Sequence, residues 1–178
     1  PDGTFDNSSG WIIGGSHGFA QAYEFTASES GFAEDLTAAL QSHGGTRSVT
    51  VSLFSSLDGN LGTLLEEITF TDEMPDYLSG LAMTVELSGT TYLEAGQSYW
   101  LGARVAPGGS VTWMQNNTGA TGRRTAGKFG GYTGFISDTQ NAAAFRIGIF
   151  DTQTIPEPTL LPLLFVGVFG GFAYRKRR

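Results

Sequence analysis

One stretch of the chain has the residue types and spacing of a nucleophilic site. Residues 14–18 read GGSHG and match G-x-S-x-G, the pattern that sets a reactive serine, here Ser16, on a turn between a strand and a helix. Residues 19–25 alternate as a strand does, and the other histidine of the chain, His43, lies in a glycine turn. We therefore expect a flexible turn at this position and no catalytic residues.

Acidic residues could supply metal or glycosidase chemistry at two further places. Asp72, Glu73 and Asp76 crowd one loop and offer the oxygen ligands that Ca²⁺ prefers. Their spacing fits no calcium motif, so an ordinary solvated loop is the preferred interpretation. Glu66 and Glu67 are adjacent, so in a strand they face opposite sides and cannot form a glycosidase pair alone. We predict no metal site and no cofactor.

Aromatic residues raise the alternative of carbohydrate binding. Trp100, Trp113, Tyr132 and Phe135 could form an exposed platform for sugar rings. Aromatic residues on alternating strands usually fill the core instead. The platform requires Trp100 or Trp113 to be exposed, so Trp100, Trp113 and Tyr132 stand as possible sugar contacts with core packing as the alternative.

A cluster of basic residues is a second possible contact for a glycan. Arg123, Arg124 and Lys128 lie within residues 116–134, a glycine-rich stretch with little periodicity. We expect this stretch to form a long loop or a broken edge hairpin. Its three cations could meet an acidic polysaccharide, and the alternative is a solvated loop.

Charge and composition exclude several classes of protein. The 178 residues carry a formal charge of −7, yet four of the ten cations are the last four residues, and the chain upstream has six cations against 17 acids, or −11. Nucleic-acid binding needs clustered Lys and Arg on the folded domain, so nucleic acid is not an expected partner. The absence of cysteine excludes disulfide scaffolds, thiolate zinc sites and cysteine nucleophiles.

Alternating apolar and polar residues predict the strands that would position these side chains. We expect strands over residues 19–26, 35–42, 48–54, 64–70, 83–87, 97–105, 111–114 and 144–150. Phe32, Leu36 and Leu40 also fit one face of a helix, which is the alternative to a strand over residues 35–42. Glycine supplies 26 of the 178 residues, which suits short strands joined by tight turns.

This pattern predicts an all-β protein. About eight short strands with turn signals between them are typical of an antiparallel β-sandwich, jelly-roll-like, which we place at residues 1–151. A body of that length forms one domain with a sizeable core. The chain opens at Pro1 without an apolar leader, so we expect that any signal peptide has been removed or left out.

The C-terminal segment has three parts: a linker at 152–159, an uncharged stretch at 160–174 and a basic end at 175–178. The larger side chains of the uncharged stretch are Leu160, Leu161, Leu163, Leu164, Phe165, Val166, Val168, Phe169, Phe172 and Tyr174. As a helix these fifteen residues span roughly 22 Å, short of the roughly 30 Å hydrocarbon core. The stretch has no polar face, and the four cations that follow it suit a cytoplasmic end. We predict one transmembrane helix, with an ordinary amphipathic or core helix as the alternative. The four cations are Arg175, Lys176, Arg177 and Arg178.

The linker contains Pro156, Glu157 and Pro158, and together with the uncharged stretch and the basic end it resembles the PEP-CTERM sorting signal. The resemblance covers about 24 residues, and its departure is Pro162, inside the start of the span. It implies export by a bacterium with an outer membrane, usually one that makes exopolysaccharide. A membrane-embedded exosortase would recognise the signal and cleave near Pro-Glu-Pro. The precursor would be held in the inner membrane with its N-terminus outside the cytoplasm.

The body shows a second resemblance. The motifs VTVSLF at 49–54, GTLL at 62–65 and LEAGQSYWL at 93–101 are similar to the bacterial choice-of-anchor exported domains, over about residues 10–150. That family has no assigned catalytic residues, so none is carried over to this chain. The expected function is a non-enzymatic protein of the cell surface or extracellular matrix. The alternative is a carbohydrate-binding module that engages exopolysaccharide through exposed aromatic residues, and a secreted hydrolase ranks last.

Overall fold

The protein is all-β over the part of the chain that a computed structural model describes, which is residues 5–45, 47–127, 132 and 135–150. The predicted class of antiparallel β-sheets is confirmed there. Thirteen strands and one 3-10 turn, η1 (Gly15–His17), lie in that part. The strands are β1 (Phe5–Gly14), β2 (Ala20–Thr26), β3 (Gly31–Ala38), β4 (Leu40–Ser42), β5 (Ser48–Leu57), β6 (Asn60–Thr71), β7 (Met83–Glu86), β8 (Tyr92–Leu93), β9 (Ser98–Val105), β10 (Ser110–Asn116), β11 (Thr121–Gly127), β12 (Phe135–Asn141) and β13 (Phe145–Phe150).

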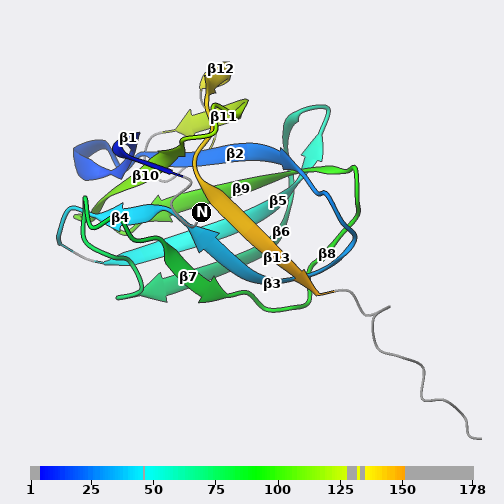
Figure 1. The fold of residues 1–178 in the computed structure, drawn as a ribbon, viewed down its shortest axis with the longest axis horizontal. Helices are drawn as coiled ribbons and strands as arrows, with labels where there is room; N and C mark the ends of the chain where they lie inside the picture. The colour runs from blue at the N-terminus through cyan, green and yellow to red at the C-terminus, as the bar shows by residue number, and fades with distance from the viewer. Residues whose placement is uncertain (1–4, 46, 128–131, 133–134, 151–178) are drawn as a thin grey trace, which may run out of the picture.

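The larger layer is a six-stranded sheet in the order β12-β11-β2-β9-β5-β6, with every neighbouring pair antiparallel. Its strands run side by side across the back of the molecule in Figure 1. Along β9, Leu101 and Ala103 are buried in the core. Because side chains alternate along a strand, Trp100, Gly102 and Arg104 project from the other side, which we call the outer face.

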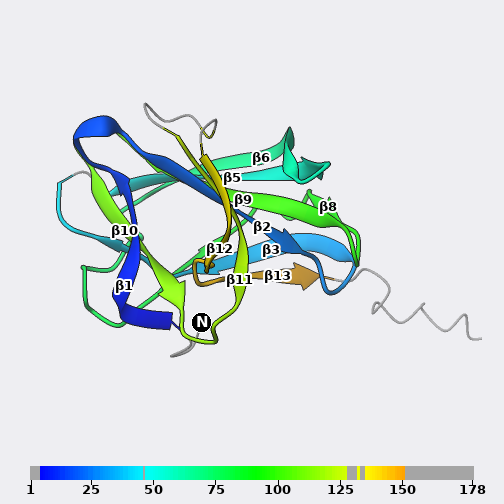
Figure 2. The same cartoon turned by 90° about the horizontal axis from the view of Figure 1, so that it is seen from above.

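The second layer combines two smaller sheets, β1-β10-β4 and β13-β3-β7, with β8 paired to β3. Only Ala39 separates β3 from β4, so β10 beside β4 is continued by β13 beside β3. Three backbone hydrogen bonds join the sheets there: Ala39 N–H donates to Ala144 C=O (3.0 Å), Met114 N–H to Ala39 C=O (2.8 Å) and Ala144 N–H to Met114 C=O (2.8 Å). The two small sheets therefore form one layer facing the six-stranded sheet (Figure 2).

The main core lies between the two layers. Tyr23 and Leu101 enter it from the six-stranded sheet, and Leu36, Leu40 and Trp113 enter it from the second layer. Each inner face contributes about every second residue of its strands, which is the origin of the period-two pattern in the sequence.

Residues 35–42 form strand, so the helical alternative is wrong. β3 and β4 cover this segment apart from Ala39, and Leu36 and Leu40 are fully buried. Pairing decides the outcome, because β3 lies between β13 and β7 and a helix could not satisfy either neighbour. The other predicted strands are also present, with shifted ends.

Three strands of seven residues or more were not predicted: β1, β11 and β12. β1 has polar residues at 6–9, and its register against β10 shifts between Asp6 and Gly10, which hides any alternation. β11 lies within residues 116–134 and pairs with both β2 and β12. The long-loop interpretation of that stretch is therefore wrong, and the edge-hairpin interpretation is confirmed.

The C-terminal predictions fall outside the described residues. The linker at 152–159, the span at 160–174 and the basic end at 175–178 all belong to the part that the structure does not describe. Across the described ranges, no helix has the length and apolar character needed to cross a membrane.

Candidate functional site

Trp113 is part of the core and not of a surface platform. Its side chain is 1% exposed, and its ring meets Tyr23 edge-on with the ring centroids 5.0 Å apart. The indole N–H donates to the carbonyl of Ala144 at 3.2 Å, so its polar group is satisfied inside the protein. The prediction of a possible sugar contact at Trp113 is wrong, because its strand directs it between the two layers.

Trp100 is buried as well, although it projects from the outer face. It is 0% exposed, and its indole nitrogen has no hydrogen-bond partner among the described residues. On the same face Tyr132 covers Gly102, and the Tyr132 ring packs edge-on against Phe54 with centroids 5.3 Å apart. Phe54 is the cross-strand neighbour of Trp100, so Tyr132, Phe54 and Trp100 lie on the same face, and we call these three residues the second core. A sugar contact at Trp100 is therefore also wrong.

Beside this second core, a row of hydrogen bonds crosses the outer face. The Tyr132 hydroxyl lies 3.2 Å from Ser52 Oγ, and the Ser52 hydroxyl donates to Glu67 Oε2 at 2.9 Å. Arg104 Nη2 then donates to Glu67 Oε1 at 2.9 Å. Neighbouring strands β5, β6 and β9 supply three of these residues, so the sheet itself sets their spacing.

The row ends in a cleft of about 900 Å³ at one edge of the outer face. Two turns form its rim, one between β1 and β2 and one between β9 and β10, and hydroxyl-bearing strand residues line its floor. The lining residues are Gly15, Ser16, Gly18, Ser48, Thr50, Thr69, Arg104, Val105, Ala106, Pro107, Gly108, Gly109 and Ser110.

The cleft rim is held together by close backbone contact. Gly15 N–H donates to the carbonyl of Gly109 at 3.0 Å, which ties the two turns to each other. Gly14 has φ +81°, and a Cβ atom there would clash with Val105 and with the carbonyl of Gly109. Only glycine permits this approach, so Gly14 is required where the two turns of the rim meet.

Burial controls the protonation of the Tyr132 end of the row. Removal from water raises the pKa of Tyr132, and the charge of Glu67 adds to the rise; the Ser52 hydrogen bond and the charge of Arg104 oppose it. The phenol is therefore a hydrogen-bond donor over the whole physiological range. The row presents donors and acceptors in fixed positions, which suits binding of a polar ligand.

Ser16 lies in a turn that enters a strand. η1 holds Ser16, Gly18 closes it in the left-handed conformation, and β2 follows. This confirms the predicted turn, since a nucleophile elbow requires a helix at that point. His43 is engaged elsewhere: its Nε2 lies 2.6 Å from Thr112 Oγ1, and its ring lies 3.9 Å from that of Tyr77. The side chain of His17 is outside the described set.

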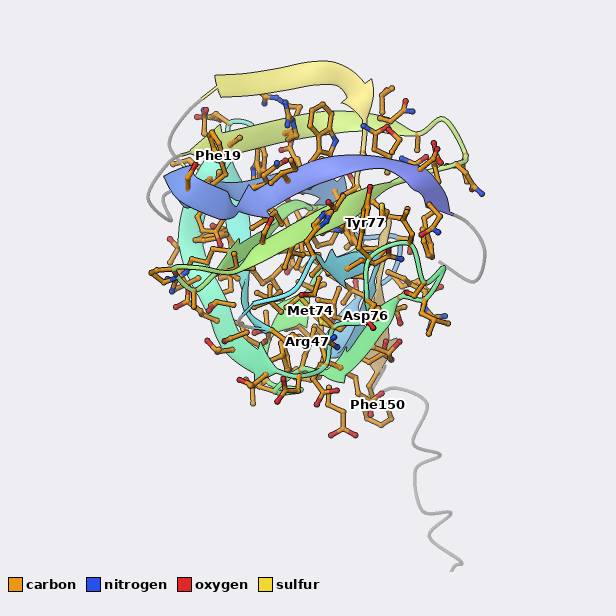
Figure 3. The ribbon with its side chains drawn as sticks, turned by 90° about the vertical axis from the view of Figure 1, so that its left-hand side faces the viewer. Phe19, Arg47, Met74, Asp76, Tyr77 and Phe150 are labelled. Carbon is orange, nitrogen blue, oxygen red and sulfur yellow. The ribbon has the colours of Figure 1, made fainter. Side chains whose placement is uncertain are left out.

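The acidic loop at 72–76 is tied to the body by an ion pair. Asp76 accepts a hydrogen bond from Arg47, and Arg47 also donates to the carbonyl of Met74 at 3.4 Å (Figure 3). Within the described residues, no three His, Asp or Glu side chains gather closely enough to hold a metal ion.

Glu66 and Glu67 face opposite sides of β6, as predicted. Glu66 accepts hydrogen bonds from the Ser88 N–H and the Thr91 hydroxyl, both at 2.7 Å, in the segment between β7 and β8. Glu67 faces the outer side and accepts from Ser52 and Arg104. The two carboxylates therefore serve different contacts.

The two adjacent arginines of β11 also point to opposite faces. Arg123 lies on the outer face, 3.9 Å from Glu24. The guanidinium of Arg124 stacks 3.7 Å from the centre of the Trp11 ring and donates to Gln21 Oε1 at 3.2 Å. They form no shared basic surface, so the predicted contact with an acidic polysaccharide loses its basis. Lys128 lies outside the described residues.

Sequence reasoning missed the Arg104–Glu67 pair. The signal was present, because Thr50 and Ser52 alternate with Val49, Val51 and Leu53 and so mark an outward polar face. The strand pairing that brings β6 and β9 to either side of β5 could not be predicted from one sequence.

Comparison with known proteins found no match: no family model and no curated protein sequence matches the chain. Of the predicted sorting residues, Pro156, Glu157 and Pro158 lie outside the described residues, as does the basic end from Arg175 to Arg178. The side chain of Phe135 is likewise not described.

Proposed function

We propose that this chain is a non-enzymatic protein that bacteria export and sort through a C-terminal PEP-CTERM signal processed by exosortase. The observation that carries the proposal is the order of three features: Pro-Glu-Pro at 156–158, fifteen uncharged residues at 160–174 and four cations at 175–178. Each proline fixes φ and disfavours helix before it, so we expect the motif to be extended and separate from the span. An extended segment is the shape that a protease cleft binds.

The body supports this proposal through its architecture. Strands from the two ends of the domain pair with each other: β1 with β10, β2 with β9, and β3 with β13. Such pairing is typical of jelly-roll topologies, and we propose that finer class for residues 1–151, in line with the resemblance to choice-of-anchor domains. An acidic sandwich of this kind stays soluble outside the cell.

The engagement of the candidate catalytic groups supports a non-enzymatic role. Ser16 enters a strand where a nucleophile elbow needs a helix. Glu66 and Glu67 are bound by different partners on opposite sides of β6. Ser52 and Arg104 bind Glu67, and Tyr132 contacts Ser52, so these groups position one another.

The proposal names the partners of the protein and its location in the cell. Exosortase is the processing partner, and the inner membrane holds the precursor by residues 160–174 with the N-terminus outside the cytoplasm. The cations at 175–178 keep the last residues on the cytoplasmic side until cleavage. The mature protein then resides at the cell surface or in the extracellular matrix.

The test is the intact mass of the mature protein recovered from the cell surface of its host. We expect a product that ends near residues 156–158. Replacing Pro156 and Pro158 together by Ala should leave the precursor uncleaved in the inner membrane, whereas the matched control Glu29→Gln, an exposed change in the body, should be processed normally. Mature surface protein that keeps the full tail would contradict the proposal.

A further inference from the structure

We propose that the outer-face cleft beside Arg104 and Glu67 binds a neutral, polyhydroxylated glycan. The inference rests on the geometry of this cleft and does not depend on the sorting signal. It replaces the aromatic platform, because both tryptophans are buried, and the acidic-polysaccharide contact, because Arg123 and Arg124 point apart.

The ion pair offers what a sugar diol needs. Neighbouring hydroxyls of a sugar each donate and accept, so they pair best with a donor and an acceptor placed side by side. Arg104 Nη2 and Glu67 Oε1 lie 2.9 Å apart, and their side chains are 39% and 36% exposed. Both groups keep unused hydrogen-bonding capacity: Arg104 has further N–H groups, and each Glu67 oxygen has a second lone pair.

Hydroxyls continue this arrangement in two rows across three strands. Thr69, Thr50 and Arg104 are consecutive cross-strand neighbours on β6, β5 and β9, and the two threonine oxygens lie 2.8 Å apart. Glu67 and Ser52 form the next row on the same face. The ladder of β-sheet hydrogen bonds holds both rows, so the ligand meets a surface that is already in position.

The charge balance favours a neutral ligand. Glu67 neutralises Arg104 at contact distance, and the chain upstream of Arg175 carries −11. A polyanion would be repelled by this body and would compete with Glu67 for Arg104. A neutral polyol is not repelled by the acidic body and does not compete with Glu67 for Arg104.

The size of the cleft agrees with this ligand class. Its volume of about 900 Å³ lies within the range of roughly 300–1,000 Å³ that is usual for small-ligand sites. The two turns of the rim are joined by the hydrogen bond from Gly15 N–H to Gly109 C=O. A few sugar units fit such a space, with the rest of a chain free to leave along the sheet.

Binding is tested with the full chain in a polyoxyethylene detergent, which carries no sugar. Cellohexaose, mannohexaose and hexagalacturonate are titrated separately, with saturation-transfer NMR for contact and calorimetry for affinity. We expect at least one neutral hexasaccharide to bind, and hexagalacturonate to bind at least about tenfold more weakly.

Variants locate the contact. Arg104→Met and Glu67→Gln should each lower the affinity for the neutral hexasaccharide by about tenfold or more, because each leaves a sugar hydroxyl unpaired. The matched control is the other Arg–Glu pair of the same face: Arg123→Met and Glu24→Gln should bind as wild type. If Arg104→Met fails to fold, Thr69→Val, an exposed change of equal shape, takes its place with the same expected direction.

Three results would overturn the inference. The first is that neither neutral hexasaccharide binds the wild-type protein. The second is that hexagalacturonate binds more tightly than the neutral hexasaccharides. The third is that the folded Arg104→Met or Thr69→Val variant binds with unchanged affinity. None of these outcomes bears on cleavage at residues 156–158, and loss of cleavage leaves binding unaffected, so the two proposals fail separately.

Discussion

The indole of Trp113 meets the phenol of Tyr23 edge-on, with ring centroids 5.0 Å apart and ring planes at 79°. Trp113 comes from β10 in the second layer and Tyr23 from β2 in the six-stranded sheet. The contact therefore joins the two layers at the centre of the core, and Phe145 packs on the same indole with its centroid 5.9 Å away. Such aromatic pairs stabilise a fold beyond their buried area.

Replacing Trp113 by Ala should cost about 3–5 kcal/mol of the free energy of unfolding, because it leaves a cavity between the layers and removes the bond to Ala144. Urea unfolding followed by circular dichroism measures the loss. Leu57→Ala, an exposed change in β5, serves as the control and should stay within about 0.5 kcal/mol of wild type. A Trp113→Ala variant as stable as that control would contradict the layer arrangement.

Stability should fall in alkaline solution. Burial raises the pKa of Tyr23 well above the ordinary value near 10, with the nearby Arg124 charge opposing it only in part. The unfolded chain loses the phenol proton first, so stability is fully present below about pH 10 and declines above it, by about 1.4 kcal/mol per pH unit for one such group. Tyr132 acts in the same direction.

Urea midpoints at pH 8, 9, 10 and 11 measure this decline. Tyr23→Phe keeps the ring and removes the ionisable group, so its stability should fall less steeply above about pH 10. Equal slopes for the two proteins would show that Tyr23 does not carry the effect.

Gly102→Ala should uncover Trp100. The added Cβ would lie 2.8 Å from the Tyr132 ring, so that ring must move away from Ser52 and from the rest of the second core. We expect a loss of about 1–3 kcal/mol and stronger acrylamide quenching of tryptophan fluorescence. Gly122→Ala on the same sheet is the control, since its Cβ meets Glu24 at an ordinary 3.5 Å. Unchanged quenching in Gly102→Ala would argue against Tyr132 as the cover.

The two arginines of β11 should differ in their contribution to stability. Arg124→Met loses the stack on Trp11 and the hydrogen bond to Gln21, which should cost about 1–2 kcal/mol. Arg123→Met loses a long pair with Glu24 and the packing of the guanidinium over Gly59, and its side chain is 38% exposed, so the change should stay below about 1 kcal/mol. Thermal unfolding of both variants checks the order, and the reverse order would contradict the opposite facing of the two side chains.

Strand positions followed from the sequence wherever one face is apolar and the other polar. The alternation of Val49, Val51 and Leu53 with Thr50 and Ser52 predicts β5 correctly, because half of the strand must be buried. β1 and β11 were not predicted because polar residues and glycine occupy both of their faces near register shifts. Their backbone hydrogen bonds, and not their side chains, hold them in the sheets.

The candidate site was less predictable than the fold. The sequence allowed Trp100 and Trp113 either to bind sugar at the surface or to pack in the core. Which of the two holds depends on what covers each side chain in the folded protein. Trp113 faces the other layer, while Trp100 faces outward, on the face where Tyr132 packs over Gly102 and against Phe54. No pattern within one strand distinguishes these cases.

The sequence by itself determined the all-β class, the turn at Ser16 and the opposite facing of Glu66 and Glu67, because each follows from local alternation and backbone preference. Tertiary structure alone decided that Arg104 meets Glu67. These residues lie 37 positions apart, on β9 and β6, and only the strand order of the sheet brings them to either side of β5. A binding site made by cross-strand neighbours exists only once non-local pairing has chosen the neighbours.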